Sequence, residues 1–176
     1  DSLGAPAPAD NEHQQGLVHS INPQTILAVV GTPPVNAHAG DPITITVMET
    51  NSGDDTLTNV SVTGAPCGAW TAAAGFNGTL IPGASTTFTC TFPAGAAGTD
   101  TAWSADGHGT DSLGRQVPTG AGTPEHQQGS VHSINPATTL SVVGNPPTTV
   151  ASGTPVTITV HELNSGTDPL TGVHVT

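Results

Sequence analysis

The chain has 176 residues, of which 34% are hydrophobic, and it contains three Phe, two Trp and no Tyr. Thirteen acidic residues face a single basic residue, Arg115, so the net charge is −12. Binding to nucleic acid or to an anionic membrane needs a basic surface, which this composition excludes. No apolar run approaches the ~20 residues that span a bilayer, so no membrane insertion is predicted.

Glycine, proline and threonine dominate the sequence, with 22 Gly and 16 Pro. These residue types favour strands and turns over helices. No stretch places apolar residues at helical spacing for long enough to form a sizeable helix. The predicted fold class is therefore all-β.

The first part of the chain returns later in the sequence. Residues 1–4 (DSLG) recur at 111–114, and His13 aligns with His126 at an offset of 126 − 13 = 113. From there the alignment runs without a gap to Thr63, and 33 of its 51 positions are identical. Such similarity indicates a tandem duplication with one structural unit per period.

The unit can be followed through its complete copy, residues 24–118. Apolar residues alternate with polar ones in several short runs, and Gly, Pro, Asn and Asp clusters separate them. Strands are predicted at 24–30, 42–49, 57–63, 70–74, 86–92, 99–104 and 113–117, with a loop over 105–109. Seven or eight short strands with turns between them are typical of an immunoglobulin-like β-sandwich.

The repeat also predicts the division of the chain. Residues 1–7 correspond to the last strand of a preceding repeat, and residues 8–23 form a linker. Residues 24–118 form the complete sandwich and 119–136 the second linker. Residues 137–176 supply the first half of the next repeat. We therefore expect either a longer array or a chain completed by strands of a neighbouring copy.

Several motifs carry a resemblance to a known family. They are the Asn51-x-Gly53 strand end, the strand over 57–62, the Leu-x-Pro-Gly turn at 80–83, and Gly109–Asp111 with Gly114. Together they resemble the conserved repeat domain of prokaryotic surface proteins, an adhesion-type immunoglobulin-like module. The resemblance implies secreted, tandemly repeated stalk or surface-layer modules without catalytic residues. It covers roughly 24–118 fully and 137–176 in part.

Two cysteines, Cys67 and Cys90, fall in the same predicted sandwich. We expect a disulfide, which fits an oxidising compartment; the alternative is two free buried thiols.

Histidine and aspartate supply weak metal-site candidates. His13 and His19 recur in register as His126 and His132, within the repeated sequence His-Gln-Gln-Gly-x-Val-His. Imidazole is a common metal ligand, but the favoured interpretation is a polar linker. Further candidates are Asp54 and Asp55, whose carboxylates suit calcium but match no calcium-loop pattern; turn residues are the favoured interpretation. No cofactor is predicted.

No nucleophile motif or phosphate loop is present, so the chain is not expected to be an enzyme. Asn59 and Asn77 match the N-glycosylation acceptor pattern.

The repeated linker is expected to be ordered, because its sequence and not only its composition is kept. Val18 and Ile21, with their counterparts Val131 and Ile134, are the expected assembly contacts on a neighbouring domain or chain.

These patterns lead to two hypotheses. The first is a structural module of an extracellular filament, sheath or cell-surface stalk, which acts as a rigid spacer and joins copies of itself head to tail. The second is an adhesin domain that recognises a glycan or host protein through its loops, for which Trp70 and Trp103 are the available aromatic residues.

Overall fold

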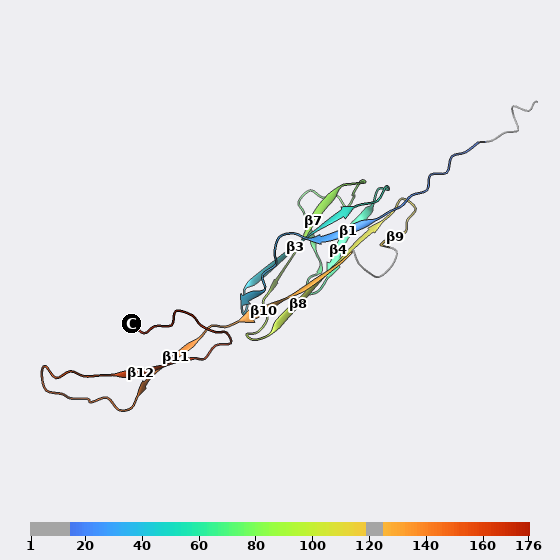
Figure 1. Cartoon of the computed structure of the whole chain (residues 1–176). Coiled ribbons are helices and arrows are strands. Elements are labelled where there is room, and N and C mark those ends of the chain that lie inside the picture. Colours follow the sequence, from blue (N-terminus) through green and yellow to red (C-terminus); the bar gives the residue numbers. More distant parts are fainter. Residues whose placement is uncertain (1–14, 119–124) are drawn as a thin grey trace, which may run out of the picture.

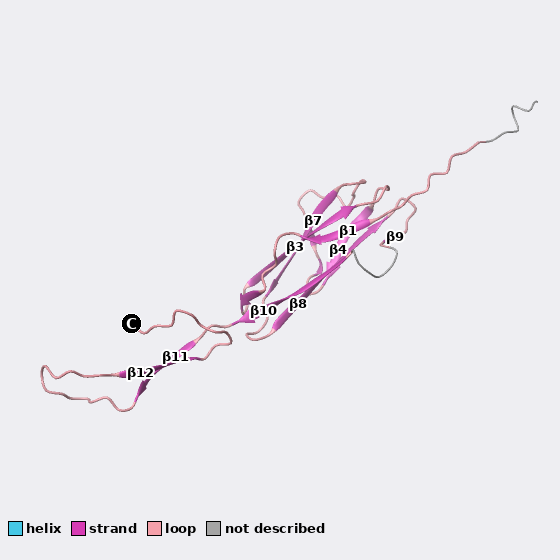
Figure 2. Ribbon diagram, viewed as in Figure 1, coloured by secondary structure: helices cyan, strands magenta, loops and turns pink. Residues whose placement is uncertain are grey.

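The computed structural model describes residues 15–118 and 125–176. It is all-β, with 47% of the residues in strands and no helix in the part described. The strands form three sheets, and nearly all their pairings are antiparallel (Figures 1 and 2). The all-β prediction is thereby confirmed.

The first sheet has four strands in the order β1-β3-β7-β6. Their bounds are Thr25–Val29 for β1, Pro42–Asn51 for β3, Thr71–Ala72 for β6 and Ser85–Pro93 for β7. In β3 the alternate residues Ile43, Ile45 and Val47 are buried while Thr44 is exposed, as the sequence pattern predicts.

The second sheet has the order β2-β10-β8-β4-β5, with β9 paired to β8. These strands run over Asn36–His38 (β2), Thr58–Gly64 (β4), Gly68–Ala69 (β5), Asp100–Thr110 (β8), Gln116–Val117 (β9) and His126–Ile134 (β10).

One hydrophobic core lies between these two sheets. Ile45, Val47 and Phe88 come from the first sheet and Val62 and Trp103 from the second, and each is at most 4% exposed. Two antiparallel sheets that share one core are a β-sandwich. Burial of these apolar side chains is the main favourable contribution to folding.

Strand β10 corrects the predicted domain division. The linker expected over 119–136 is wrong for residues 126–134, because they pair with β8 in antiparallel register and with β2 in parallel register. The sandwich predicted over 24–118 therefore needs this further strand, and short β2 was also missed. Residues 119–124 and the predicted strand 1–7 lie outside the described residues, as do 8–14 of the first linker.

Strand β8 is longer than predicted. The loop expected over 105–109 is wrong, since β8 continues through Gly107 and Gly109 to Thr110. Both glycines face inward, where a Cβ at Gly109 would already touch Leu57 and Val60. These glycines fit a crowded interior and not a turn.

The third sheet consists of β11 (Thr138–Val143) and β12 (Thr159–Asn164). It lies beyond β10, at the end of the sandwich opposite to residues 15–24 (Figure 1). The expected third strand of this half unit, near residues 170–176, is absent from the described structure. No helix in the described ranges is long and apolar enough to cross a bilayer.

Candidate functional site

Strand β10 is the last strand of the sandwich and carries the repeated sequence. Its inward residues alternate with exposed ones: Val131 and Ser133 are fully buried, and Ser130 is exposed. Gly129 lies so close to Trp103 that a Cβ there would stand 2.8 Å from three atoms of the indole. Gly129, Val131 and Ser133 therefore define the inner face of this strand.

The N-terminal copy of β10, residues 13–21, keeps this whole inner face. Gly16, Val18 and Ser20 align with the three inward residues at the offset of 113. The one difference is Leu17, which aligns with the exposed Ser130. Residues 16–21 of this copy are not in a strand, and Val18 is 97% exposed. Residues 16–21 therefore have the inward residues of a sandwich strand but are not part of the described sandwich.

Residues 137–176 show the complementary feature, an uncovered core face. Leu140, Ile158 and Val160 align with Leu27, Ile45 and Val47, which are at most 1% exposed. In the half unit the same positions are 55%, 59% and 37% exposed. Aliphatic residues gathered on an open face indicate a surface that another element covers.

The turn that follows β3 shows why the two units have the same local structure. Asn51 Nδ2 donates to the backbone oxygens of Asp55 and Leu80, at 2.7 and 2.8 Å. Asn164 Nδ2 makes the equivalent bond to Asp168 at 2.8 Å. A Cβ at Gly53 would meet the backbone of residues 22–24, and Gly166 lies in the same position against 135–137.

The two aspartates proposed as calcium ligands instead hold loops together. Asp54 accepts a hydrogen bond from the Asn22 backbone at 2.6 Å, and Asp55 accepts one from the Ser112 backbone at 2.8 Å. The bond from Ser112 lowers the pKa of the Asp55 carboxyl, because it stabilises the charged form.

The recurring histidines that the structure describes, His19, His126 and His132, form no metal site. His126 Nδ1 lies 2.6 Å from Asp106 and His132 Nδ1 lies 2.7 Å from Asp100, both on the outer side of the sheet. The bond to Asp106 raises the pKa of His126. His19 lies in the exposed N-terminal stretch, and His13 is outside the described residues. The described ranges contain no group of three or more His, Cys, Asp or Glu arranged to hold a metal.

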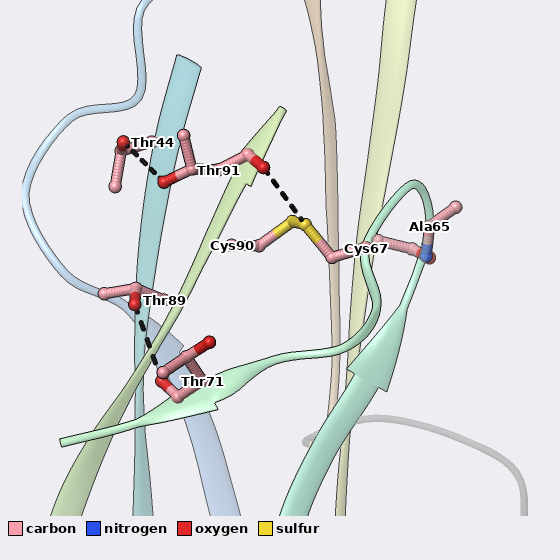
Figure 3. Close-up of a disulfide and its surroundings, with 8 residues drawn as sticks. Thr44, Ala65, Cys67, Thr71, Thr89, Cys90 and Thr91 are labelled. Atoms are coloured by element: carbon pink, nitrogen blue, oxygen red, sulfur yellow. Dashed lines mark hydrogen bonds between the residues drawn. A yellow bond between two sulfur atoms is a disulfide. The ribbon is translucent and has the colours of Figure 1, made fainter. Parts of the chain in front are cut away.

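Cys67 and Cys90 form the predicted disulfide, with a Cα–Cα distance of 5.9 Å. The bridge joins β7 of the first sheet to the turn between β4 and β5 of the second, and Cys67 Sγ also lies 3.7 Å from the Thr91 oxygen (Figure 3). It therefore ties the two sheets covalently.

Replacing both cysteines by alanine should lower the free energy of unfolding by about 3 kcal/mol, since the bridge closes a loop of 23 residues in the unfolded chain. Urea unfolding of the double variant and of the reduced wild type would measure this. Two reactive thiols in the unfolded, unreduced wild type would contradict the bridge.

A buried carboxyl pair is the feature that the sequence interpretation missed. Glu49 on β3 is 0% exposed and Glu125, just before β10, is 4% exposed. None of their four carboxyl oxygens has a hydrogen-bond partner, nor does the hydroxyl of buried Thr25. Burial and then repulsion from Glu125 raise the pKa of Glu49 to about 9.

Gly107 makes room for this pair on the facing strand β8. A Cβ there would stand within 2.5 Å of one oxygen from each glutamate. The two oxygens are therefore no more than 2 × 2.5 = 5 Å apart. Alternation in β3 could have indicated the inward position of Glu49, two residues beyond Val47, and the repeat keeps all three side chains as Glu12, Thr138 and Glu162.

The remaining candidates lie on the surface or in the core. Asn59 and Asn77 are exposed, so both acceptor sequences are accessible. Trp70 and Trp103 are 6% and 4% exposed and pack edge to face, 6.5 Å apart. Of the four expected assembly contacts, Val131 is buried within β10 and Ile134 is half-buried beside it. Their counterparts Val18 and Ile21 are exposed and half-buried.

No protein-family model matches the chain, and no curated protein matches it.

Proposed function

We propose that this protein is a structural repeat module of an extracellular filament, sheath or cell-surface stalk, built from tandem immunoglobulin-like sandwiches. Each sandwich acts as a rigid spacer, and successive units join head to tail. The observation that carries the proposal is the N-terminal copy of β10, which keeps the inward residues of a last strand while Val18 stays 97% exposed.

The partner in this assembly is another unit of the same kind. Residues 15–24 and the β11–β12 sheet extend from opposite ends of the sandwich (Figure 1). Residues 16–21 carry the inward residues of a last strand, and the β11–β12 sheet has an uncovered core face. Contacts between two different ends are heterologous, and they propagate along one axis when the rotation between copies does not close a ring. Strand addition to an open sheet provides the type of contact.

The disulfide supports an extracellular setting, because such bonds persist in oxidising compartments. The same bond suits a mechanical role, since it ties one sheet to the other. The adhesin alternative gains no support from the two tryptophans, which are buried in the core and are not available to stack on a glycan.

The Val18→Asp variant should lose assembly, because a charged side chain at an inward strand position cannot enter an apolar core. Sedimentation and negative-stain imaging of the whole chain would show long particles for the wild type and short ones for the variant. Leu17→Ser is the matched control: it makes the copy identical to β10 and changes only an outward position, so assembly should persist.

Two results would contradict this function. One is a wild-type chain that stays monomeric while residues 137–176 are protected from hydrogen exchange. The other is equal assembly of Val18→Asp and Leu17→Ser.

A further inference from the structure

The buried carboxyl pair is separate from every assembly contact described above. Glu49 comes from the first sheet, Glu125 precedes the last strand of the second, and Thr25 begins β1. All three are at least 95% buried. Five side-chain oxygens thus converge in the interior, and each of them lacks a hydrogen-bond partner.

Burying such a group of oxygens lowers the stability of the fold unless each oxygen gains a hydrogen-bond partner or binds a cation. A buried polar oxygen without a partner costs about 1–3 kcal/mol, and a buried charge costs more. No Lys occurs in the sequence, and Arg115 is exposed, on the loop before β9. No basic side chain therefore neutralises the two carboxylates from within the described sandwich.

We propose that Glu49, Glu125 and Thr25 form an internal binding site for a divalent cation that prefers oxygen ligands, with calcium as the best fit. Calcium takes 6–8 oxygen ligands at about 2.3–2.6 Å in irregular geometry. One oxygen from each glutamate lies within 5 Å of the other, as two ligands of a single calcium ion must. Magnesium demands stricter octahedral geometry at shorter distances, so it fits this mixed set less well.

A pocket of about 430 Å³ adjoins the site. Thr25 and Glu125 line it, together with polar residues Asn22, Gln24 and Ser52. Gly107 contributes by lacking a side chain, because a Cβ there would fill the space beside both carboxylates.

The sequence gives independent support. Thr25 and Glu49 recur as Thr138 and Glu162, and Glu12 precedes the N-terminal copy of β10 at the position of Glu125. A buried glutamate that serves only as filler would be replaced easily by an apolar residue of similar size. The repeat keeps both glutamates and the threonine, which is the expected pattern for a ligand set.

Thermal unfolding of the whole chain tests the site. After treatment with a chelator, calcium chloride should raise the unfolding midpoint of the wild type by about 4 °C or more over sodium chloride at equal ionic strength. Glu49→Gln and Glu125→Gln should lose this shift, although the neutral amide leaves them folded. Asp41→Asn, which removes an exposed acidic charge at the start of β3, should retain it.

Titration calorimetry with calcium provides the second readout. We expect one site per chain in the wild type and in Asp41→Asn, and no such site in Glu49→Gln. A wild type without calcium binding would overturn the inference. So would an equal thermal shift in all four proteins, which would indicate calcium bound diffusely to a chain of net charge −12.

Discussion

The free energy of unfolding of the metal-free protein should fall as the pH rises from about 5 to about 9, with Glu49 as the main cause. The pKa of Glu49 is about 9 in the folded chain against 4.5 for an ordinary glutamate. The folded state therefore holds a proton that the unfolded state has released. The resulting stability is fully present below pH 4.5 and is lost as the pH approaches 9, by up to about 1.4 kcal/mol per pH unit.

Urea unfolding with a chelator at several pH values would measure this slope. Glu49→Gln cannot ionise, so its curve should be much flatter over the same range, with the contribution of His126 remaining, and the variant should exceed the wild type at pH 8. Asp41→Asn serves as the control and should keep the wild-type slope. Parallel curves for wild type and Glu49→Gln would show that the buried carboxyl does not titrate in this way.

Local patterning predicted most of the strands correctly. Alternating β-branched residues located β1, β3, β4 and β7, because one face of each strand is buried and the other is exposed. The same rule failed for β8. Its inward positions beyond Ala105 are Gly107 and Gly109, and glycines are usually turn residues. At Gly107 the facing glutamates leave no space for a side chain.

Strand β10 shows a different limit of sequence interpretation. Its outward residues are His and Gln, and its inward ones include Gly129 and Ser133, so a single large apolar residue, Val131, marks the buried face. The sequence therefore looks like a polar linker. Only the pairing with β8 and β2 reveals a strand, and that pairing joins residues far apart in the chain.

The candidate sites also differ in how far the sequence alone could predict them. The disulfide was predictable because two cysteines within one sandwich have few alternatives. The carboxyl pair was not, since Glu49 and Glu125 are 76 residues apart (125 − 49) and glutamate is ordinarily a surface residue. Alternation in β3 indicates that Glu49 points inward, but no local pattern indicates that Glu125 meets it, because that contact depends on packing between the sheets.

Gly129→Ala should destabilise the sandwich by about 1–3 kcal/mol, because the added methyl group would overlap the Trp103 indole. Trp103 cannot move away easily, since it is 4% exposed and packs against Trp70. Urea unfolding would measure the loss. The prediction tests directly whether residues 126–134 belong to the sandwich, because a glycine in a solvent-exposed linker would tolerate alanine without cost.

Gly16→Ala is the matched control, since Gly16 lies in the same local sequence, His-Gln-Gln-Gly, and no atom lies within 4 Å of a Cβ placed there. Its free energy of unfolding should stay within about 0.5 kcal/mol of the wild type. The difference between the two variants in free energy of unfolding measures the effect of tertiary packing, because both substitutions have the same intrinsic effect on the backbone. Equal losses would mean that alanine acts through the unfolded chain, and the placement of β10 against Trp103 would then be wrong.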